Sequence, residues 1–417
     1  MSQADWDRLQ YYSRRVKYFE AEDEPLVHSS TYLRIAQFQS SALFPSLRRL
    51  QYNLDDRSNT CTYFYIFLFQ SPLLESLEFF HIKDLENTTV GPFLATLSSQ
   101  TLRRIVLRDG WMDVDILEKS IVHFKQLQSL ELLNAVFMDD FALLEVLGSL
   151  PSLENLTLVA SDPASHPTPE KSNSQSGGPR YFDALESLHV TGSFFLIQHL
   201  LGFIDSPLLN SIEVFPAPNE NETDSEDLFT PSMTIITAKW SQSLKNLLIC
   251  SKINYAPPPR AVSKCLKLLR NLHKMQTFRL DWRMKNLNDD IRRLVMSWPK
   301  LRILNLNQTL ISLSTLRIIA ENCPELRHLH IRLSTSTIPP FDASNSLSLR
   351  HNLEVLTLGR ANPSSNTQTM ESQIQVTRHL DLIFPYLTSI EVKSNDVFWE
   401  GIRDLIHLCQ DASLSRG

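Results

Sequence analysis

Large apolar residues recur along this chain in a fixed pattern, leucine-x-x-leucine-x-leucine. In the stretch 323–331 the pattern falls on Leu326, Leu329 and Ile331. The last two positions are two residues apart, so their side chains lie on one face of a short strand. Apolar residues over 313–320 recur at the spacing of an α-helix. One strand and one helix are too small to bury an apolar face alone, so the pattern predicts stacked neighbours of the same kind.

The same triplet occurs thirteen times, with first positions at Leu47, Leu74, Leu102, Leu127, Leu153, Leu185, Leu209, Leu244, Met275, Leu301, Leu326, Leu353 and Leu387. Most successive first positions differ by 25 to 28 residues, which is typical of leucine-rich repeats. We therefore predict an α/β leucine-rich-repeat solenoid, a horseshoe of about 13 repeats with parallel strands on its concave side and helices on its convex side. The alternative is an ordinary α/β domain with leucine-rich strands.

Amphipathic stretches between the triplets predict the helices, at residues 113–123, 139–149, 261–272, 288–298, 312–321, 372–383 and 396–409. Residues 5–20 predict a helix with Asp5 at its N-cap, followed by a short strand. The apolar run 63–69 predicts a buried helix face. A solenoid needs covered ends. We therefore predict an N-terminal capping helix and connection over 1–42, repeats over 43–395, and a C-terminal capping helix and tail over 396–417.

Polar insertions lengthen some of the intervals, at residues 161–180, 216–227, 255–260, 334–346 and 360–371. Each begins just after a predicted strand. In a parallel stack all strand ends of one kind lie on the same rim, so the insertions are expected to gather there. They represent either tolerated length variation on an exposed rim or a rim that contacts a partner.

Composition and charge exclude several classes of function. A net charge of −6 gives no support for a nucleic-acid or anionic-membrane partner. The five cysteines are scattered without a C-x-x-C pair, which predicts reduced, buried thiols in an intracellular protein of the cytoplasm or nucleus. The first residues lack the features of a signal peptide, and the apolar run 63–69 is too short to span a bilayer.

Motifs for catalysis are missing from the sequence. It contains no glycine-rich phosphate loop, no G-x-S-x-G and no H-E-x-x-H. His328 and His330 would face the same side of a strand, but no cysteine or carboxylate stands at metal-ligand spacing in that repeat. The acidic pairs 139–140 and 289–290 lie at predicted helix starts, where capping explains them. We predict no enzymatic activity, no cofactor and no metal site.

The residues between the leucines predict a binding surface on the concave side. The candidate binding residues are Phe80, Glu78, Glu131, Leu133, Val159, Glu213, Phe215, Arg279, His328, His330 and Arg332. The glutamates make the first half acidic, and the histidines and arginines make the later half basic. We predict that this surface binds a protein segment, with the apolar residues as anchors and the charges setting its orientation. Alternatively, the apolar residues pack beneath the rim loops and the charges are solvated.

Three stretches, 43–50, 71–77 and 323–329, resemble the degenerate repeats of fungal F-box/leucine-rich-repeat proteins. The opening residues 6–16 are similar to the segment that follows the F-box and linker in that group. The resemblance implies a ribonuclease-inhibitor-like horseshoe that serves as the substrate receptor of a Skp1–cullin–F-box ubiquitin ligase. Only five residues precede Trp6, so we expect the F-box itself to be absent from this chain. Skp1 and a cullin would then be partners only through an upstream F-box.

Together these features predict a monomeric, non-catalytic protein-recognition module, the substrate-binding part of such a ligase receptor. Its partner would be a protein bound on the concave face or on the rim at the strand carboxyl ends. Two alternatives remain open at this point. One is a stand-alone leucine-rich-repeat scaffold or inhibitor, and the other is an enzyme with a site in the rim loops.

Overall fold

The computed structural model describes residues 2–21, 31, 35, 42–54, 62–82, 87–97, 101–109, 114–135, 142–160, 181–216, 229–250, 259–282, 287–335, 338, 349, 351–359, 369–392 and 397–414. The chain consists of two compact units, Met1–Leu209 and Asn210–Gly417. The predicted polar insertions lie wholly or largely outside the described residues. No helix in the described part of the chain is long and apolar enough to cross a membrane.

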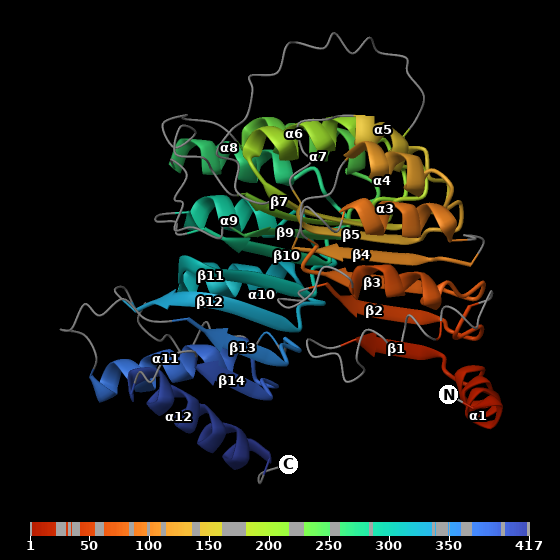
Figure 1. Ribbon diagram of the computed structural model, residues 1–417. Helices are drawn as coiled ribbons and strands as arrows, with labels where there is room; N and C mark the ends of the chain where they lie inside the picture. Colours follow the sequence, from red (N-terminus) through yellow and green to blue (C-terminus); the bar gives the residue numbers. More distant parts are fainter. Residues whose placement is uncertain are drawn as a thin grey trace. The chain divides into compact units, whose positions relative to one another are not determined.

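The first unit alternates helices with parallel strands (Figure 1). Its strands are β1 (Tyr18–Ala21), β2 (Arg49–Asn53), β3 (Ser76–Phe80), β4 (Arg104–Arg108), β5 (Ser129–Ala135), β6 (Asn155–Ala160) and β7 (Ser187–Gly192). Its helices are α1 (Gln3–Ser13), the 3₁₀ helix η1 (Thr62–Phe69), α3 (Asn87–Thr96), α4 (Val114–Ile121), α5 (Ala142–Gly148) and α6 (Phe194–Phe203). Each strand pairs in parallel with the next one along the chain.

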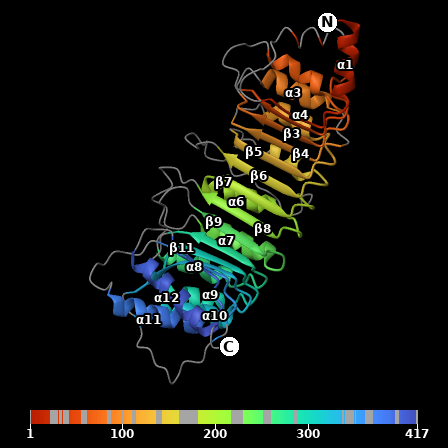
Figure 2. The same ribbon diagram turned by 90° about the horizontal axis from the view of Figure 1, so that it is seen from below.

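The second unit continues the same alternation. Its strands are β8 (Ser211–Pro216), β9 (Asn246–Cys250), β10 (Thr277–Asp281), β11 (Ile303–Ser312), β12 (His328–Ser334), β13 (Val355–Leu358) and β14 (Ser389–Val392). Its helices are α7 (Thr230–Trp240), α8 (Pro259–Leu269), α9 (Asn288–Val295), α10 (Leu313–Asn322), α11 (Met370–Ile383) and α12 (Val397–Leu414). These strands are also parallel and paired in sequence order. Within each unit the helices lie on one side of the strands (Figures 1 and 2).

The leucine triplets form the core of this ladder. Within each unit, the second residue of each triplet is paired with the second residue of the next, as Leu50 is with Leu77 in the first unit and Leu304 with Leu329 in the second. All four side chains are at most 1% exposed. All thirteen triplets lead into strands, so the predicted α/β leucine-rich-repeat fold is confirmed. The strand predicted at the end of 5–20 is also present as β1.

Within each unit, a shared backbone carbonyl joins each strand to the next at its start. The Arg48 carbonyl oxygen accepts hydrogen bonds from the N–H groups of Glu75 at 2.7 Å and Ser76 at 2.9 Å. A carbonyl has two lone pairs and can accept both. The same double acceptance occurs at Lys17, Glu75, Arg103, Gln128, Glu154, Asn210, Lys245, Gln276, Arg302, Arg327 and Glu354. This contact fixes where each strand begins relative to its neighbour.

Three helices, α3, α6 and α7, were not among the predicted ones because their sequences lack a polar face or a regular period. Helix α6, for example, is apolar nearly all round and buries five of its residues, so a one-sided pattern is missing. Helix α3 contains Pro92 within its length. The apolar run at 63–69 is buried at Ile66 and Phe69, which are at most 1% exposed, while Phe67 is half-buried.

The N-cap prediction for the first helix is wrong. Ser2, rather than Asp5, is the N-cap of α1, and its Oγ accepts from the Asp5 N–H at 3.2 Å. Asp5 in turn accepts from the Ser2 N–H at 2.9 Å. This reciprocal pair is a capping box, in which the acidic residue stands three positions after the cap. These hydrogen bonds lower the pKa of Asp5 below its ordinary value. The capping roles proposed for both chain ends stay predictions.

The stacked core makes one stability prediction. Leu329→Ala removes most of a side chain that is 1% exposed, and we expect a loss of about 2–5 kcal/mol of unfolding free energy. Urea denaturation followed by circular dichroism measures this loss. His328→Ala, at the exposed neighbouring position of β12, is the control and is expected to change stability by less than about 0.5 kcal/mol. Equal losses for the two variants would contradict the core position of Leu329.

Candidate functional site

The sheet surface on the side away from the helices, the open face, is the candidate site in both units. Side chains alternate along a strand, so the leucines point toward the helices while the residues between them point the other way. In β12 the burial pattern follows this alternation, with Leu329 and Ile331 buried, His328 exposed and His330 half-buried. The two histidines therefore share one side of the strand, as predicted.

A ladder of ion pairs crosses the open face of the first unit. Glu78 is only 4% exposed, and its Oε1 lies 3.3 Å from Arg49 Nη2 and 3.0 Å from Arg104 Nη1. The other terminal nitrogen of Arg104 donates to Glu131 Oε1 at 2.8 Å. A buried carboxylate is costly unless it is paired and hydrogen-bonded. The two arginines supply that pairing from neighbouring strands.

These pairs change the expected charge of the first unit. Sequence reasoning considered the glutamates and left out Arg49 and Arg104, which stand two positions earlier in their repeats. In a parallel register, a residue two positions earlier on the adjacent strand is a diagonal neighbour on the same face. Reading the residues two positions after the first leucine of each triplet would have identified Arg49 and Arg104. This part of the face is therefore a mixed-charge ladder in which acids alternate with arginines, rather than an acidic surface.

The ladder continues onto β1 through hydrogen bonds that neutral side chains donate to the Glu20 carboxylate. Gln51 Nε2 donates to Glu20 Oε1 at 2.6 Å, and the Tyr18 hydroxyl donates to Glu20 Oε2 at 2.5 Å. The Arg49 guanidinium lies over the Tyr18 ring, 5.4 Å from its centroid. The hydrogen bond to Glu20 raises the pKa of Tyr18. The open face from β1 to β5 is thus a connected polar network.

An apolar row runs beside this network. The predicted anchors Phe80, Leu133 and Val159 lie on the open face of β3, β5 and β6 and are partly buried. The Arg108 guanidinium lies 5.1 Å from the centroid of the Phe80 ring. Leu133 is paired in register with both Arg108 and Val159. The five candidates of the first unit therefore lie on three strands, Glu78 and Phe80 on β3, Glu131 and Leu133 on β5, and Val159 on β6.

The other six candidates lie in the second unit, on β8, β10 and β12. Glu213 and Phe215 of β8 are half-buried. Arg279 Nη2 of β10 lies 3.6 Å from Asp281 Oδ2. His328, His330 and Arg332 follow on β12. Whether any of these eleven residues binds a partner stays a prediction.

The cysteines show little nucleophilic character where the structure describes them. Cys250, Cys265 and Cys323 are buried and form no disulfide. Burial raises the pKa of the Cys250 thiol to about 11 and that of Cys323 to about 12, so both are thiols at neutral pH. The prediction of a buried thiol is wrong for Cys409, which is exposed near the end of α12. Among the described residues, no three histidine, cysteine or acidic side chains gather as a metal site requires.

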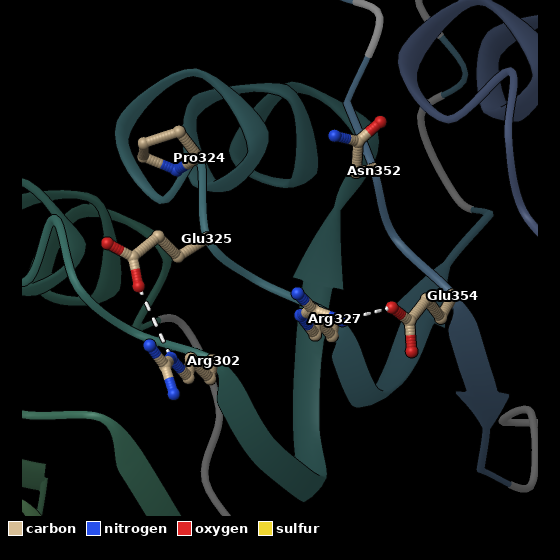
Figure 3. A pocket seen from close by; sticks show the side chains of 6 residues that line it. All are labelled: Arg302, Pro324, Glu325, Arg327, Asn352 and Glu354. Atoms are coloured by element: carbon tan, nitrogen blue, oxygen red, sulfur yellow. Dashed lines mark hydrogen bonds and ion pairs between the residues drawn. The ribbon is translucent and has the colours of Figure 1, made fainter.

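A hollow of about 580 Å³ opens at the starts of β11, β12 and β13 (Figure 3). Its lining residues are Arg302, Pro324, Glu325, Arg327, Asn352 and Glu354. Figure 3 shows two ion pairs across it, Arg302–Glu325 at 3.2 Å and Arg327–Glu354 at 2.7 Å. These four side chains are 43% to 62% exposed, so the pairs contribute little stability. The lining contains no serine, cysteine or histidine, and it offers no nucleophile with an adjacent base.

The ladder of parallel strands, each followed by a return toward the helix layer, defines a leucine-rich-repeat protein. No protein-family model matches the sequence, and no curated protein matches it. Solved structures with a similar course include an internalin from Listeria monocytogenes, at 14% identity over 93% of this chain and 89% of that chain with a TM-score of 0.46. A leucine-rich-repeat protein from Leptospira interrogans has 13% identity over 92% and 98%, with a TM-score of 0.41.

A third similar structure is that of Rad7 in the yeast Rad7–Elc1 complex, at 15% identity over 87% of this chain and 92% of that chain with a TM-score of 0.42. At these identities and scores the likeness concerns the repeat architecture alone. The assignment of the fold therefore rests on the strand register and the burial of the triplets. Membership of the F-box group and a fungal origin stay predictions.

The ion-pair ladder makes a prediction about stability. Arg104→Ala leaves the buried Glu78 with one arginine and removes the partner of Glu131. Because the Arg104 side chain is 36% exposed, we discount the full cost of a broken buried pair and expect a loss of about 1–2 kcal/mol. Urea denaturation measures the loss. The matched control is Arg327→Ala, whose ion pair with Glu354 is exposed, with an expected loss below about 1 kcal/mol. A control loss as large as that of Arg104→Ala would refute the special role of the ladder.

Proposed function

We propose that this chain is a non-catalytic protein-recognition scaffold that binds a segment of another protein on the open face of its sheet. The observation that carries the proposal is the juxtaposition on β2 to β6 of a paired charge ladder with the apolar row of Phe80, Leu133 and Val159. Aromatic residues and arginine are enriched where protein partners bind. Repeat proteins present extended surfaces of this kind to their partners.

Preorganisation of the charged side chains supports this function. Each arginine or glutamate that is already held by its neighbours loses less conformational freedom when a partner docks. Arg104 is held by two carboxylates, and Arg49 lies against both Glu78 and the Tyr18 ring. The backbone groups of these strands are used within the parallel ladder. We therefore expect side chains to make the contacts with the partner on this face. The apolar row supplies the desolvated contacts, and the charged residues set the orientation of the partner.

The first test compares two phenylalanines of the same unit. Phe80→Ala removes the predicted anchor on the open face, and Phe195→Ala removes a 41% exposed ring on α6, on the helix side. A partner isolated by cross-linking to the wild-type chain is purified, and its affinity for each variant is measured by calorimetry. We expect Phe80→Ala to weaken binding at least tenfold, or about 1.4 kcal/mol, and Phe195→Ala to leave it unchanged. The proposal fails if both variants bind like the wild type, or if Phe80→Ala lowers thermal stability with binding intact.

We propose a finer role as well, in which the scaffold is the substrate-binding part of an F-box-type ubiquitin-ligase receptor. Its support is the resemblance of stretches 43–50, 71–77 and 323–329 to the repeats of that group. A substrate receptor commits its bound protein to degradation. We therefore expect the half-life of the bound partner to lengthen several-fold when the gene for this chain is deleted, and proteasome inhibition to remove the difference.

The measurement is a translation-arrest chase of the partner in cells with and without the chain. The open-face variant Phe80→Ala, expressed in place of the wild type, is expected to behave like the deletion, while Phe195→Ala rescues turnover. An unchanged half-life in the deletion strain would refute the ligase role. It would leave the recognition role standing, with a stand-alone scaffold or inhibitor as its form.

A further inference from the structure

The charge of this chain is divided unevenly between its two units. Residues 1–209 contain 16 lysines and arginines against 26 aspartates and glutamates, a net charge of −10. Residues 210–417 contain 24 against 20, a net charge of +4. Within the second unit, residues 239–302 alone carry 15 basic side chains against 3 acidic ones. The net charge of −6 for the whole chain therefore averages over a strongly basic segment.

Six of these cations already have interactions. The three acids of the segment each lie beside an arginine, in the ion pairs Arg279–Asp281 at 3.6 Å, Arg292–Asp289 at 3.5 Å and Arg270–Asp290 at 3.7 Å. Lys239 lies over the Trp240 ring, Lys264 has an interaction of its own, and Arg302 pairs with Glu325. These six cations are therefore not counted as available to a ligand.

Six further cations of the segment are exposed, and no acidic side chain in the described part of the chain is paired with them. They are Lys245, Arg260, Lys267, Lys274, Arg293 and Lys300, which together we call the basic surface. Helices α7 and α8 contain no aspartate or glutamate along their whole length. Clustered charges of one sign raise the local concentration of an oppositely charged ligand. The basic surface therefore favours a polyanion.

One part of the basic surface lies on the helix side of the second unit. Helices α7, α8 and α9 pack against one another there in chain order (Figure 1). Arg260 and Lys267 stand seven residues apart in α8, which is two turns, so they share one side of the helix about 10 Å apart. Arg293 lies on the neighbouring α9.

The other part lies on the rim where the strands begin. Lys245, Lys274 and Lys300 each stand within three residues before the start of β9, β10 and β11. Neighbouring strands lie about 4.8 Å apart, so the three lysines form a closely spaced row. Lys267, in the last turn of α8, joins the helix part to this rim.

The composition of the basic surface favours a phosphate backbone over a protein. Four of its six residues are lysines, whereas protein interfaces are depleted of lysine and enriched in aromatic residues. Among the described residues of 239–302, Met296 is the one exposed large apolar side chain. Sites for single strands carry aromatic rings on which bases stack, and helices that bind membranes expose an apolar face. A duplex needs neither, because lysine and arginine bind its phosphates directly.

We propose that the basic surface binds a nucleic-acid duplex through its phosphates, without reading the base sequence. This activity goes beyond the protein recognition proposed above. It uses the helix side and the strand-start rim of the second unit, and the protein segment is bound on the open face.

The test uses a fluorescein-labelled DNA duplex of twenty base pairs and fluorescence anisotropy with the full chain. We expect the logarithm of the association constant to fall with the logarithm of salt concentration with a slope of about −4, as for roughly four phosphate contacts. The double variant Lys274→Glu/Lys300→Glu is expected to weaken binding at least tenfold and to reduce the slope by about 2.

The matched control is Lys119→Glu/Lys125→Glu, which makes the same charge change at two exposed lysines of the first unit. It is expected to keep the affinity within about twofold of the wild type. An equal loss in both double variants would overturn the proposal, since net charge alone would then explain the binding. Circular dichroism verifies that each variant is folded.

Three further probes test the nature of the ligand. They are a single strand of the same length, a polyglutamate peptide, and vesicles of phosphatidylcholine and phosphatidylserine. We expect the duplex to bind at least fivefold more tightly than the single strand or the peptide, and the vesicles not to sediment the chain. Absence of duplex binding at about 50 mM salt, or tighter binding of any of the other three probes, would overturn the proposal.

Failure of this inference is distinguishable from failure of the recognition function. Lys274→Glu/Lys300→Glu is expected to bind the protein partner like the wild type, and Phe80→Ala is expected to bind the duplex like the wild type.

Discussion

Within each unit, the start of every strand is fixed to the next strand by one backbone carbonyl that accepts two N–H groups from it. Arg48 in the first unit and Arg302 in the second make this contact in the same way. It sets the register in which Leu50 meets Leu77 and Leu304 meets Leu329. Neither a strand nor a helix of one repeat can bury its apolar side alone. The core therefore forms only when the repeats stack in this register.

The same register determines the open face. Once the leucines stack in phase, the residues between them stand in columns across the strands, and diagonal neighbours come within reach of each other. In the first unit this brings Arg49 and Arg104 to the buried carboxylate of Glu78. In the second unit Arg279 and Asp281 pair within the single strand β10 instead. Both faces keep buried polar atoms without a hydrogen-bond partner among the described residues, at Ser76 and Arg108 in the first unit and at Arg279 and Asp281 in the second.

Sequence reasoning reached the fold because its main signal is local and repeated. A period-2 pattern inside a repeat of about 26 residues predicts parallel strands without any knowledge of distant contacts. It failed for α6, whose apolar residues leave no polar face to mark a helix. It also placed the first N-cap at Asp5, because aspartate is itself a common N-cap residue, whereas Asp5 is the acidic third residue of a capping box that begins at Ser2.

The candidate site was predictable only in part. The columns containing Glu78, Phe80 and His330 follow from the triplets, so those residues were found. The pairing of Arg49 and Arg104 with Glu78 depends on how adjacent strands are aligned. The residues of one column alone do not show that alignment. The bulge in β11 is a three-residue irregularity of pairing. A periodic sequence pattern does not predict such a bulge, because the bulge interrupts the period.

The most direct test of this account is the register itself, measured by disulfide trapping between neighbouring strands. Asn155 is paired with Ser187, and Ile303 with His328, and strands in a sheet lie about 4.8 Å apart, within reach of a disulfide. We expect the double variants Asn155→Cys/Ser187→Cys and Ile303→Cys/His328→Cys to cross-link under mild oxidation, as mapped by mass spectrometry. The displaced pair Asn155→Cys/Thr191→Cys is expected to remain reduced. Cross-linking of the displaced pair, with neither in-register pair oxidised, would contradict the parallel ladder.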